Sequence, residues 1–320
     1  MSNRVSGSII ALATAAVLMS VTARDSAAQE EGGGGAYKPR SGCPEDVGID
    51  FHRCAQEKMK TFKPPLTPDG RPDFRGYWSR TLTSATIEER GPKLPEPRTS
   101  GVRRASTIVD PPDGMIPYQP WAREQAHWNH DVYIDTQSQC YLPGPQRVPY
   151  TSPGGYLILQ PPGDREVVMF IERVHMYHVI PTDGRPHIPA NIKLFEGDPV
   201  GRWEGNTLVV DITNLNGETW FDESGDFLSD TAHIVERWTF MDQNVIHVEV
   251  TVEDPKVLTR PMKQAFAMIR IKDPSHELLE DACFEGERDL RTISKFTNRY
   301  PGWKGLPGPH ARGRDAAAER

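Results

Sequence analysis

The 320-residue chain lacks the short motifs that mark several common enzyme classes. It has no G-x-S-x-G nucleophile elbow, no P-loop, no H-E-x-x-H zinc motif and no glycine-rich dinucleotide fingerprint. It also has no C-x-x-C pair and no convincing internal repeat. We therefore predict neither a cofactor nor a metal. The alternative is a metal bound by His175, His178 and His187, although H-x-x-H on a strand places its two histidines on opposite faces.

Positive charge and long apolar runs are also scarce. The 37 Lys and Arg residues are outnumbered by 44 Asp and Glu, which gives a net charge of −7 and leaves no basic patch. Nucleic acid is therefore not a predicted partner. The longest apolar run, Ile9–Val21, is shorter than the roughly twenty residues that a membrane-spanning helix needs. We predict no membrane span in the mature protein.

The first 28 residues have the pattern of a secretory signal peptide. Arg4 supplies the positive start, Ile9–Val21 the apolar centre, and Ser26-Ala27-Ala28 the small residues that a signal peptidase reads. Cleavage is predicted after Ala28, with Ala23 as a second candidate and an uncleaved membrane anchor as the alternative. We therefore expect a secreted or periplasmic protein.

Four cysteines in an exported chain favour disulfides over a zinc site, because no ligand spacing typical of zinc is present. Four cysteines allow three pairings. Cys43 and Cys54 share a short N-terminal segment, whereas Cys140 and Cys283 each lie beside predicted β structure. We predict the pairs Cys43–Cys54 and Cys140–Cys283.

The remaining chain divides by composition. Residues 29–63 are predicted to form a flexible leader and a cysteine-containing segment, and residues 301–320 a disordered tail. Residues 64–155 are rich in Pro and Gly, which predicts a long coil packed on the core and held by Trp78, Trp121 and Trp128. Only Trp121–Tyr133 has helical spacing within it. An antiparallel β domain is predicted over residues 156–300.

Alternating apolar and polar residues indicate six or seven strands in this domain. They are Tyr156–Gln160, Glu166–Pro181, Thr207–Thr213, His233–Met241, Asn244–Glu253, Gln264–Lys272 and a shorter one near Leu278–Phe284. Asp242-Gln243 is predicted to form a tight hairpin turn. Without intervening helices, these strands predict an all-β fold: an antiparallel barrel or sandwich, with a lipocalin-like barrel as one form and at most one or two short helices.

Two regions supply candidate functional residues. In Glu166–Pro181, a polar group interrupts an apolar stripe, which predicts either a pocket wall or a strand end that emerges into solvent: Arg173, His175 and Tyr177. Between Trp220 and Trp238, a carboxylate-rich loop precedes a strand carrying His233 and Glu236, a pattern that favours general acid/base chemistry. The alternative is a solvated acidic surface. We expect Asp211 to take part only if its face of the strand lines a pocket shared with His233.

Several motifs resemble a family of exported bacterial proteins without an assigned function. They are DGRPDFRGYW (Asp69–Trp78), DGRPH (Asp183–His187), GRWEGNTLVVD (Gly201–Asp211), SDTAHIVERW (Ser229–Trp238) and VEDPKVLTRP (Val252–Pro261). The resemblance spans Pro64 to Leu290 and implies export and a β core, but no reaction. The positions that recur in that pattern match Arg185, His187, Arg202, Trp203, Glu204, Asp211, Asp222, His233, Glu236 and Asp254. Asn206 stands where the pattern has Asp.

Two functional hypotheses follow. The first is a cofactor-free lyase, isomerase or hydrolase that acts on a small molecule in a β-barrel pocket. In it His233 is the acid or base, Glu236 or Asp222 its partner, and Asp211 a further catalytic carboxylate. Substrate contacts are assigned to Arg173, His175, Tyr177, Arg185, His187, Arg202 and Trp203. The second hypothesis is a periplasmic ligand-binding or scaffold protein. The oligomeric state is not predicted.

Overall fold

In a computed structural model, the chain forms a mostly β structure with two α-helices among the described residues. The structure describes residues 39–45, 47–80, 87–88, 106–145, 147, 155–283 and 302–303. The helices are α1 (Gly48–Met59) and α2 (Pro120–Val132). The strands are β1 (Gly76–Arg80), β2 (Ile108–Asp110), β3 (Tyr156–Leu159), β4 (Glu166–Ile171), β5 (Met176–Pro181), β6 (Asp198–Glu204), β7 (Thr207–Thr213), β8 (His233–Asp242), β9 (Val245–Glu253) and β10 (Met262–Arg270).

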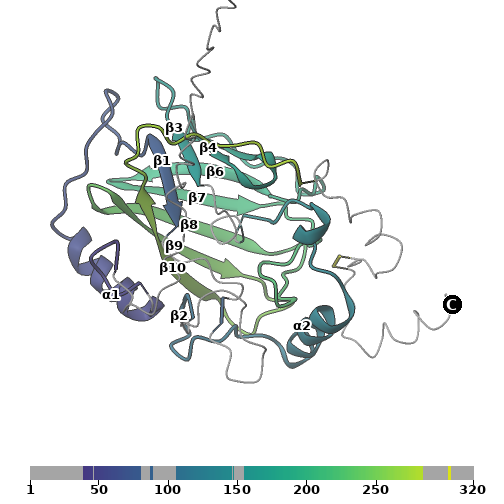
Figure 1. Cartoon of the computed structure of the whole chain (residues 1–320). Helices are drawn as coiled ribbons and strands as arrows, with labels where there is room; N and C mark the ends of the chain where they lie inside the picture. Colours follow the sequence, from purple (N-terminus) through teal and green to yellow (C-terminus); the bar gives the residue numbers. More distant parts are fainter. Residues whose placement is uncertain are drawn as a thin grey trace, which may run out of the picture. The chain divides into compact units, whose positions relative to one another are not determined.

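Nine of these strands form a nearly closed antiparallel barrel-like sheet, which confirms the predicted all-β class and the barrel alternative (Figure 1). Their order is β5-β4-β3-β1-β10-β9-β8-β7-β6, and β2 pairs separately with β10. The two ends of this order, β5 and β6, approach each other at Gly201. A Cβ atom added at Gly201 would lie 2.8 Å from Ile180 Cγ2 and 2.9 Å from Thr182 Cγ2, so only glycine permits this approach.

The barrel interior is filled by the inward-facing half of each strand. Strands β7, β8 and β9 direct alternate side chains inward, as their patterns predict, including Leu208, Ile234, Val248 and Val250. Aromatic rings pack among them: Phe74 stacks on Phe240 with ring centroids 4.9 Å apart. Side chains therefore occupy most of the interior, as in other small barrels.

The prediction of one continuous strand from Glu166 to Pro181 is wrong. The chain turns through a short 3-10 segment, Arg173–His175, and Val174 has a left-handed φ of 53°, so β4 and β5 form a hairpin. This turn interrupts the alternation and changes which residues face inward. Met176, His178 and Ile180 are buried in β5, whereas Tyr177 points outward and is 63% exposed. However, the alternation of residue types continues across this turn, so the sequence gives no sign that the strand ends there.

Two other local predictions are also wrong. The described residues of Leu278–Phe284 contain no strand. No strand was predicted over β6, which contains Gly201 and Trp203, and the two-residue turn before β7 is Gly205–Asn206, where Gly205 has a φ of 57°. Glycine and charged residues hid β6 from the alternation analysis. The Asp242-Gln243 hairpin is present, with its loop one residue later at Gln243–Asn244.

The two disulfides have the predicted pairing. Cα–Cα distances are 5.9 Å for Cys43–Cys54 and 5.8 Å for Cys140–Cys283, both in the normal range. The first pair holds α1, a helix that the sequence analysis missed within the predicted leader. Phe51 and Ala55 of α1 pack on Met241, Val245 and Ala267, on the outer side of the sheet (Figure 1). Two disulfides fit an extracellular or periplasmic protein.

In the loop-rich part before β3, Trp78 and Trp121 pack on the core. Trp78 is fully buried and donates its indole N–H to the Phe74 carbonyl, and α2 begins one residue before the predicted helix. Trp121 of α2 lies 5.6 Å from Trp303, so two residues of the predicted tail, Gly302 and Trp303, are described and Trp303 contacts the core. The predicted signal peptide (1–28), residues 29–38 and the rest of the tail lie outside the described residues. Within the described part, no helix is long and apolar enough to cross a membrane.

Candidate functional site

Strand β8 carries two of the predicted site residues to opposite faces of the sheet. His233 lies on the outer face with 37% of its side chain exposed, whereas Glu236 points into the barrel and is 5% exposed. An odd spacing of three residues on a strand places side chains on opposite faces. His233 and Glu236 therefore belong to different clusters and do not form an acid/base pair.

The inner cluster consists of His178, Glu196 and Glu236. His178 comes from β5, Glu236 from β8, and Glu196 from the segment before β6. His178 Nε2 lies 3.0 Å from Glu196 Oε2, and Glu196 Oε1 accepts the Gly144 N–H at 2.8 Å. Glu236 Oε2 accepts the indole N–H of Trp238 at 2.9 Å. His178 and Glu236 are both almost fully buried, so the cluster brings ionisable groups into an apolar interior.

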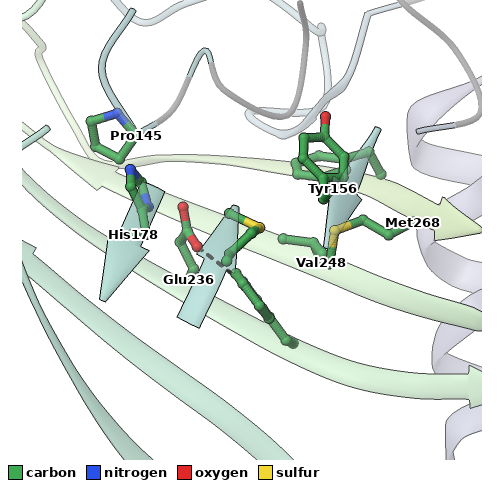
Figure 2. A pocket seen from close by; sticks show the side chains of 9 residues that line it. Pro145, Tyr156, His178, Glu236, Val248 and Met268 are labelled. Atoms are coloured by element: carbon green, nitrogen blue, oxygen red, sulfur yellow. Dashed lines mark hydrogen bonds between the residues drawn. The ribbon is translucent and has the colours of Figure 1, made fainter. Parts of the chain in front are cut away.

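A small cavity lies between these groups and the apolar wall of the barrel. Figure 2 shows the His178 imidazole and the Glu236 carboxylate side by side, with Tyr156 and Met268 further along the same wall. The lining residues are Pro145, Tyr156, Met169, His178, Glu236, Trp238, Val248, Phe266 and Met268. The centre of a water molecule can move through about 10 Å³ of this cavity, which is enough for about one water.

The pKa values of both His178 and Glu236 are raised, although burial and nearby opposite charge act against each other at each group. Burial alone would lower the pKa of His178, but the hydrogen bond to Glu196 and the charges of Glu196 and Glu236 outweigh it and raise that pKa above 6.5. Burial raises the pKa of Glu236 above 4.5, although the charge of His178 and the hydrogen bond from Trp238 oppose the rise. Both groups therefore retain a proton to a higher pH than their free side chains.

The outer cluster consists of His187, Asp198, Asp211, His233 and Glu253. Asp211 Oδ1 lies 3.1 Å from His233 Nε2 and 3.0 Å from His187 Nε2. Asp211 and His233 therefore lie on the same face of the sheet and are in contact. The other nitrogen of His187, Nδ1, lies 2.8 Å from Asp198 Oδ2, and His233 Nδ1 lies 3.7 Å from Glu253 Oε2.

The other predicted site residues lie apart from both clusters. Asp222 is buried in a loop, where it accepts backbone N–H groups of Ile87 and Ser224. Arg173 is in the turn between β4 and β5, with Nε 3.8 Å from Asp281 Oδ2. His175 is in the same turn, and its side chain lies outside the described part of the structure. Tyr177 faces outward.

Arg185, Arg202 and Trp203 have local partners. Arg185 pairs with Asp183 at 2.8 Å and Arg202 with Glu204 at 2.9 Å, both on the surface. Trp203 stacks on Phe74 and donates its indole N–H to Asp164 Oδ1 at 2.8 Å, so it is a partly buried packing residue. The alternative metal set is not assembled either, because His178 is inside the barrel and His187 outside.

His178 and Glu196 were missed as site residues. One signal for His178 was available: it is an ionisable residue between Met176 and Ile180 on the apolar face of β5. Glu196 had no such signal, because it lies in a segment without periodicity. No family model, no curated protein and no solved structure matches the chain.

Proposed function

We propose that this protein is a small-molecule enzyme that performs acid/base chemistry with water in its barrel interior. One observation carries the proposal: His178 and Glu236, two buried ionisable groups with shifted pKa values, line the same small cavity. Perturbed ionisable groups in a pocket are typical of catalytic acids and bases. The proposal keeps the predicted acid/base chemistry but replaces His233 by His178 as the imidazole.

The cavity size supports some of the predicted reaction classes more than others. Space for about one water beside a carboxylate and an imidazole favours water as a reactant or product, because a general base must lie within hydrogen-bond reach of the proton that it takes. Hydrolysis and the addition or elimination of water meet this condition, whereas an isomerisation has no need of it. The proposed class is therefore a hydrolase or a hydro-lyase.

Each inner group has a distinct role in this proposal. Glu236 exchanges a proton with the water, since its raised pKa makes it a stronger base than an exposed carboxylate. His178 supplies or removes the second proton. Glu196 positions His178 through the Nε2 contact and stabilises its protonated form. The chemistry requires no metal or cofactor in the barrel, and we place the enzyme outside the cytoplasm, as a secreted or periplasmic protein.

The second candidate function is a ligand-binding or scaffold protein. The specific observation in its favour is the tight packing of the interior, where hydrogen bonds within the protein already engage Glu236 and His178. In that case the inner cluster fixes the position of β5 against the rest of the barrel, and no bond is made or broken in the cavity.

A paired binding and turnover screen tests the proposal. Purified protein is screened by thermal shift against a panel of small esters, lactones, amides and hydroxy acids, because a ligand that binds the folded state raises its melting temperature. Hits are then followed for product formation. Glu236→Gln keeps the hydrogen-bond acceptor for Trp238 but cannot act as a base.

The proposal expects that Glu236→Gln retains the thermal shift of a hit and loses at least about 100-fold in turnover, the usual size of a general acid/base contribution. His178→Asn is expected to behave alike. Arg53→Gln, on the exposed surface of α1, is the control and retains both. Unchanged turnover in Glu236→Gln contradicts the inner site. Binding without turnover in the wild type supports the second candidate function.

A further inference from the structure

In the outer cluster, imidazole nitrogens and carboxylate oxygens lie close together in an arrangement that packing alone does not require. Four elements and a loop contribute to it: His187 from the segment after β5, Asp198 from β6, Asp211 from β7, His233 from β8 and Glu253 from β9. Three side chains at its centre, His187, Asp211 and His233, are 28%, 28% and 37% exposed. Exposed ion pairs stabilise a fold by only about 0–1 kcal/mol, so stability alone is a weak reason for so dense a cluster.

Two imidazoles converge on a single carboxylate oxygen. His187 Nε2 and His233 Nε2 lie 3.0 Å and 3.1 Å from Asp211 Oδ1. A tetrahedral metal site with metal–ligand bonds of 2.0–2.1 Å has neighbouring ligand atoms about 3.3 Å apart. Each of the two nitrogen–oxygen distances is therefore close to the distance between two neighbouring ligand atoms of one ion.

The second nitrogen of each imidazole faces a further carboxylate. His187 Nδ1 is 2.8 Å from Asp198 Oδ2, which also accepts the Ile188 N–H at 3.0 Å and is thereby fixed in place. His233 Nδ1 is 3.7 Å from Glu253 Oε2. Histidines that bind metals usually donate their second N–H to a carboxylate, which orients the ring and makes it a stronger ligand.

We propose that the outer cluster binds a divalent transition-metal ion of the zinc type. The ligands are His187 Nε2, His233 Nε2 and Asp211 Oδ1, while Asp198 and Glu253 orient the two imidazoles. Two imidazoles and one carboxylate form a ligand set that suits zinc and other first-row ions and leaves at least one position for water or another ligand. The proposal does not depend on the inner cluster.

In the structure, hydrogen bonds join the ligand atoms to one another, and no group of three described His, Cys, Asp or Glu side chains already has the arrangement of a metal site. Binding must therefore displace the protons that Asp211 Oδ1 accepts and turn both imidazoles toward a common point. Partial exposure gives these rings room to turn. Metal binding that releases protons strengthens as pH rises.

Cobalt(II) titration of the tag-free full chain tests the site directly. Co²⁺ replaces Zn²⁺ in such sites and gains intense visible absorption when it is four-coordinate, so the readout needs no substrate. We expect saturation at one equivalent of Co²⁺, loss of the absorption on adding Zn²⁺, and proton release on binding. Calorimetry with Zn²⁺ measures the affinity.

Variants then separate this site from other surface histidines. His233→Asn and His187→Asn keep the side chains polar and similar in size, and each is expected to weaken Zn²⁺ binding at least about 100-fold; Asp198→Asn is expected to weaken it by about 10-fold or more. His130→Asn is the matched control, since His130 is exposed and also contacts a carboxylate, Asp131, but no second histidine. Circular dichroism verifies that each variant folds.

The proposal is overturned if the wild type shows no stoichiometric uptake of either ion. It is equally overturned if His187→Asn and His233→Asn, folded, bind as the wild type does, because the metal would then lie elsewhere. Loss of binding in these two variants together with retention in His130→Asn supports it.

Discussion

The inner and outer clusters contain the same residue types on opposite faces of one sheet, but they differ in their exposure to solvent. Strand β8 contributes Glu236 to the inside and His233 to the outside, only three residues apart. Inside, burial raises the pKa of Glu236, whereas the hydrogen bond and charges around His178 outweigh its burial and raise its pKa as well. Outside, the ligand atoms are exposed enough to exchange protons for an ion. From this difference we propose proton transfer for the inner cluster and ion binding for the outer one.

The largest effect on stability is expected from removing the carboxylate that holds His178. Glu196→Ala removes the partner of a buried imidazole and the acceptor of the Gly144 N–H. We expect a loss of about 3 kcal/mol in the free energy of unfolding, because breaking a buried ion pair leaves an uncompensated polar group. Glu253→Ala in the outer cluster, 54% exposed, is the matched control and should cost less than about 1 kcal/mol. Equal losses in urea unfolding would remove the distinction between the two clusters.

A second buried histidine, outside both clusters, sharpens the comparison because its pKa shifts the opposite way. His247 on β9 lies under α1, where Nε2 contacts His52 Nδ1 at 3.0 Å. Burial, with a smaller effect from the His52 charge, lowers the pKa of His247 to about 3. Between pH 6.5 and 3 the folded protein thus binds fewer protons here than the unfolded chain. The contribution of His247 to the free energy of unfolding is therefore fully present above pH 6.5 and is lost as the pH falls toward 3.

His247→Phe should remove this part of the acid sensitivity. For the wild type we expect the free energy of unfolding to fall by on the order of 2 kcal/mol between pH 6.5 and 5 because of His247. The variant keeps the stacking on Phe51 and lacks the titrating group. Urea unfolding at both pH values measures the difference. A variant that loses as much stability as the wild type would show that His247 is not the group responsible.

The smallest effect is expected for Glu236→Gln. The folded-state pKa of Glu236 is raised above 4.5, so ionisation of Glu236 disfavours the folded state. The wild type therefore loses stability as the pH rises through this folded-state pKa. The glutamine cannot ionise. The stability of Glu236→Gln relative to the wild type should therefore increase from pH 4 to pH 8 in thermal unfolding. A constant difference over that range would mean that Glu236 is not perturbed by burial.

The sequence predicted the elements with strong alternation and failed where another constraint replaced it. Thr207–Thr213 was located to the residue, because one face is apolar along its whole length. Glu166–Pro181 was not, since the turn at Val174 reverses the chain without a glycine or proline to mark it. Strand β6 was missed because the glycine required by the approach of β5 resembles a turn residue.

The two clusters show the same limit. Contacts within a hairpin or between neighbouring strands, such as Asp211 with His233, follow from alternation once the register is guessed. Glu196 with His178 and Asp198 with His187 do not, because a non-periodic segment between β5 and β6 brings these side chains together. On β8, side chains at even positions face the barrel interior and those at odd positions face outward. This alternation places Glu236 in the inner cluster and His233 in the outer cluster.

The most direct test of the central claim is the titration of His178 itself. Carbon-13 labelled histidine and NMR give the midpoint of each imidazole, and His178→Asn identifies the signal. The account predicts a midpoint above 6.5 in the wild type and a lower one in Glu196→Gln, because Glu196 stabilises the protonated ring against burial. A midpoint at or below 6.5 that Glu196→Gln leaves unchanged would contradict the acid/base pair proposed for the barrel interior.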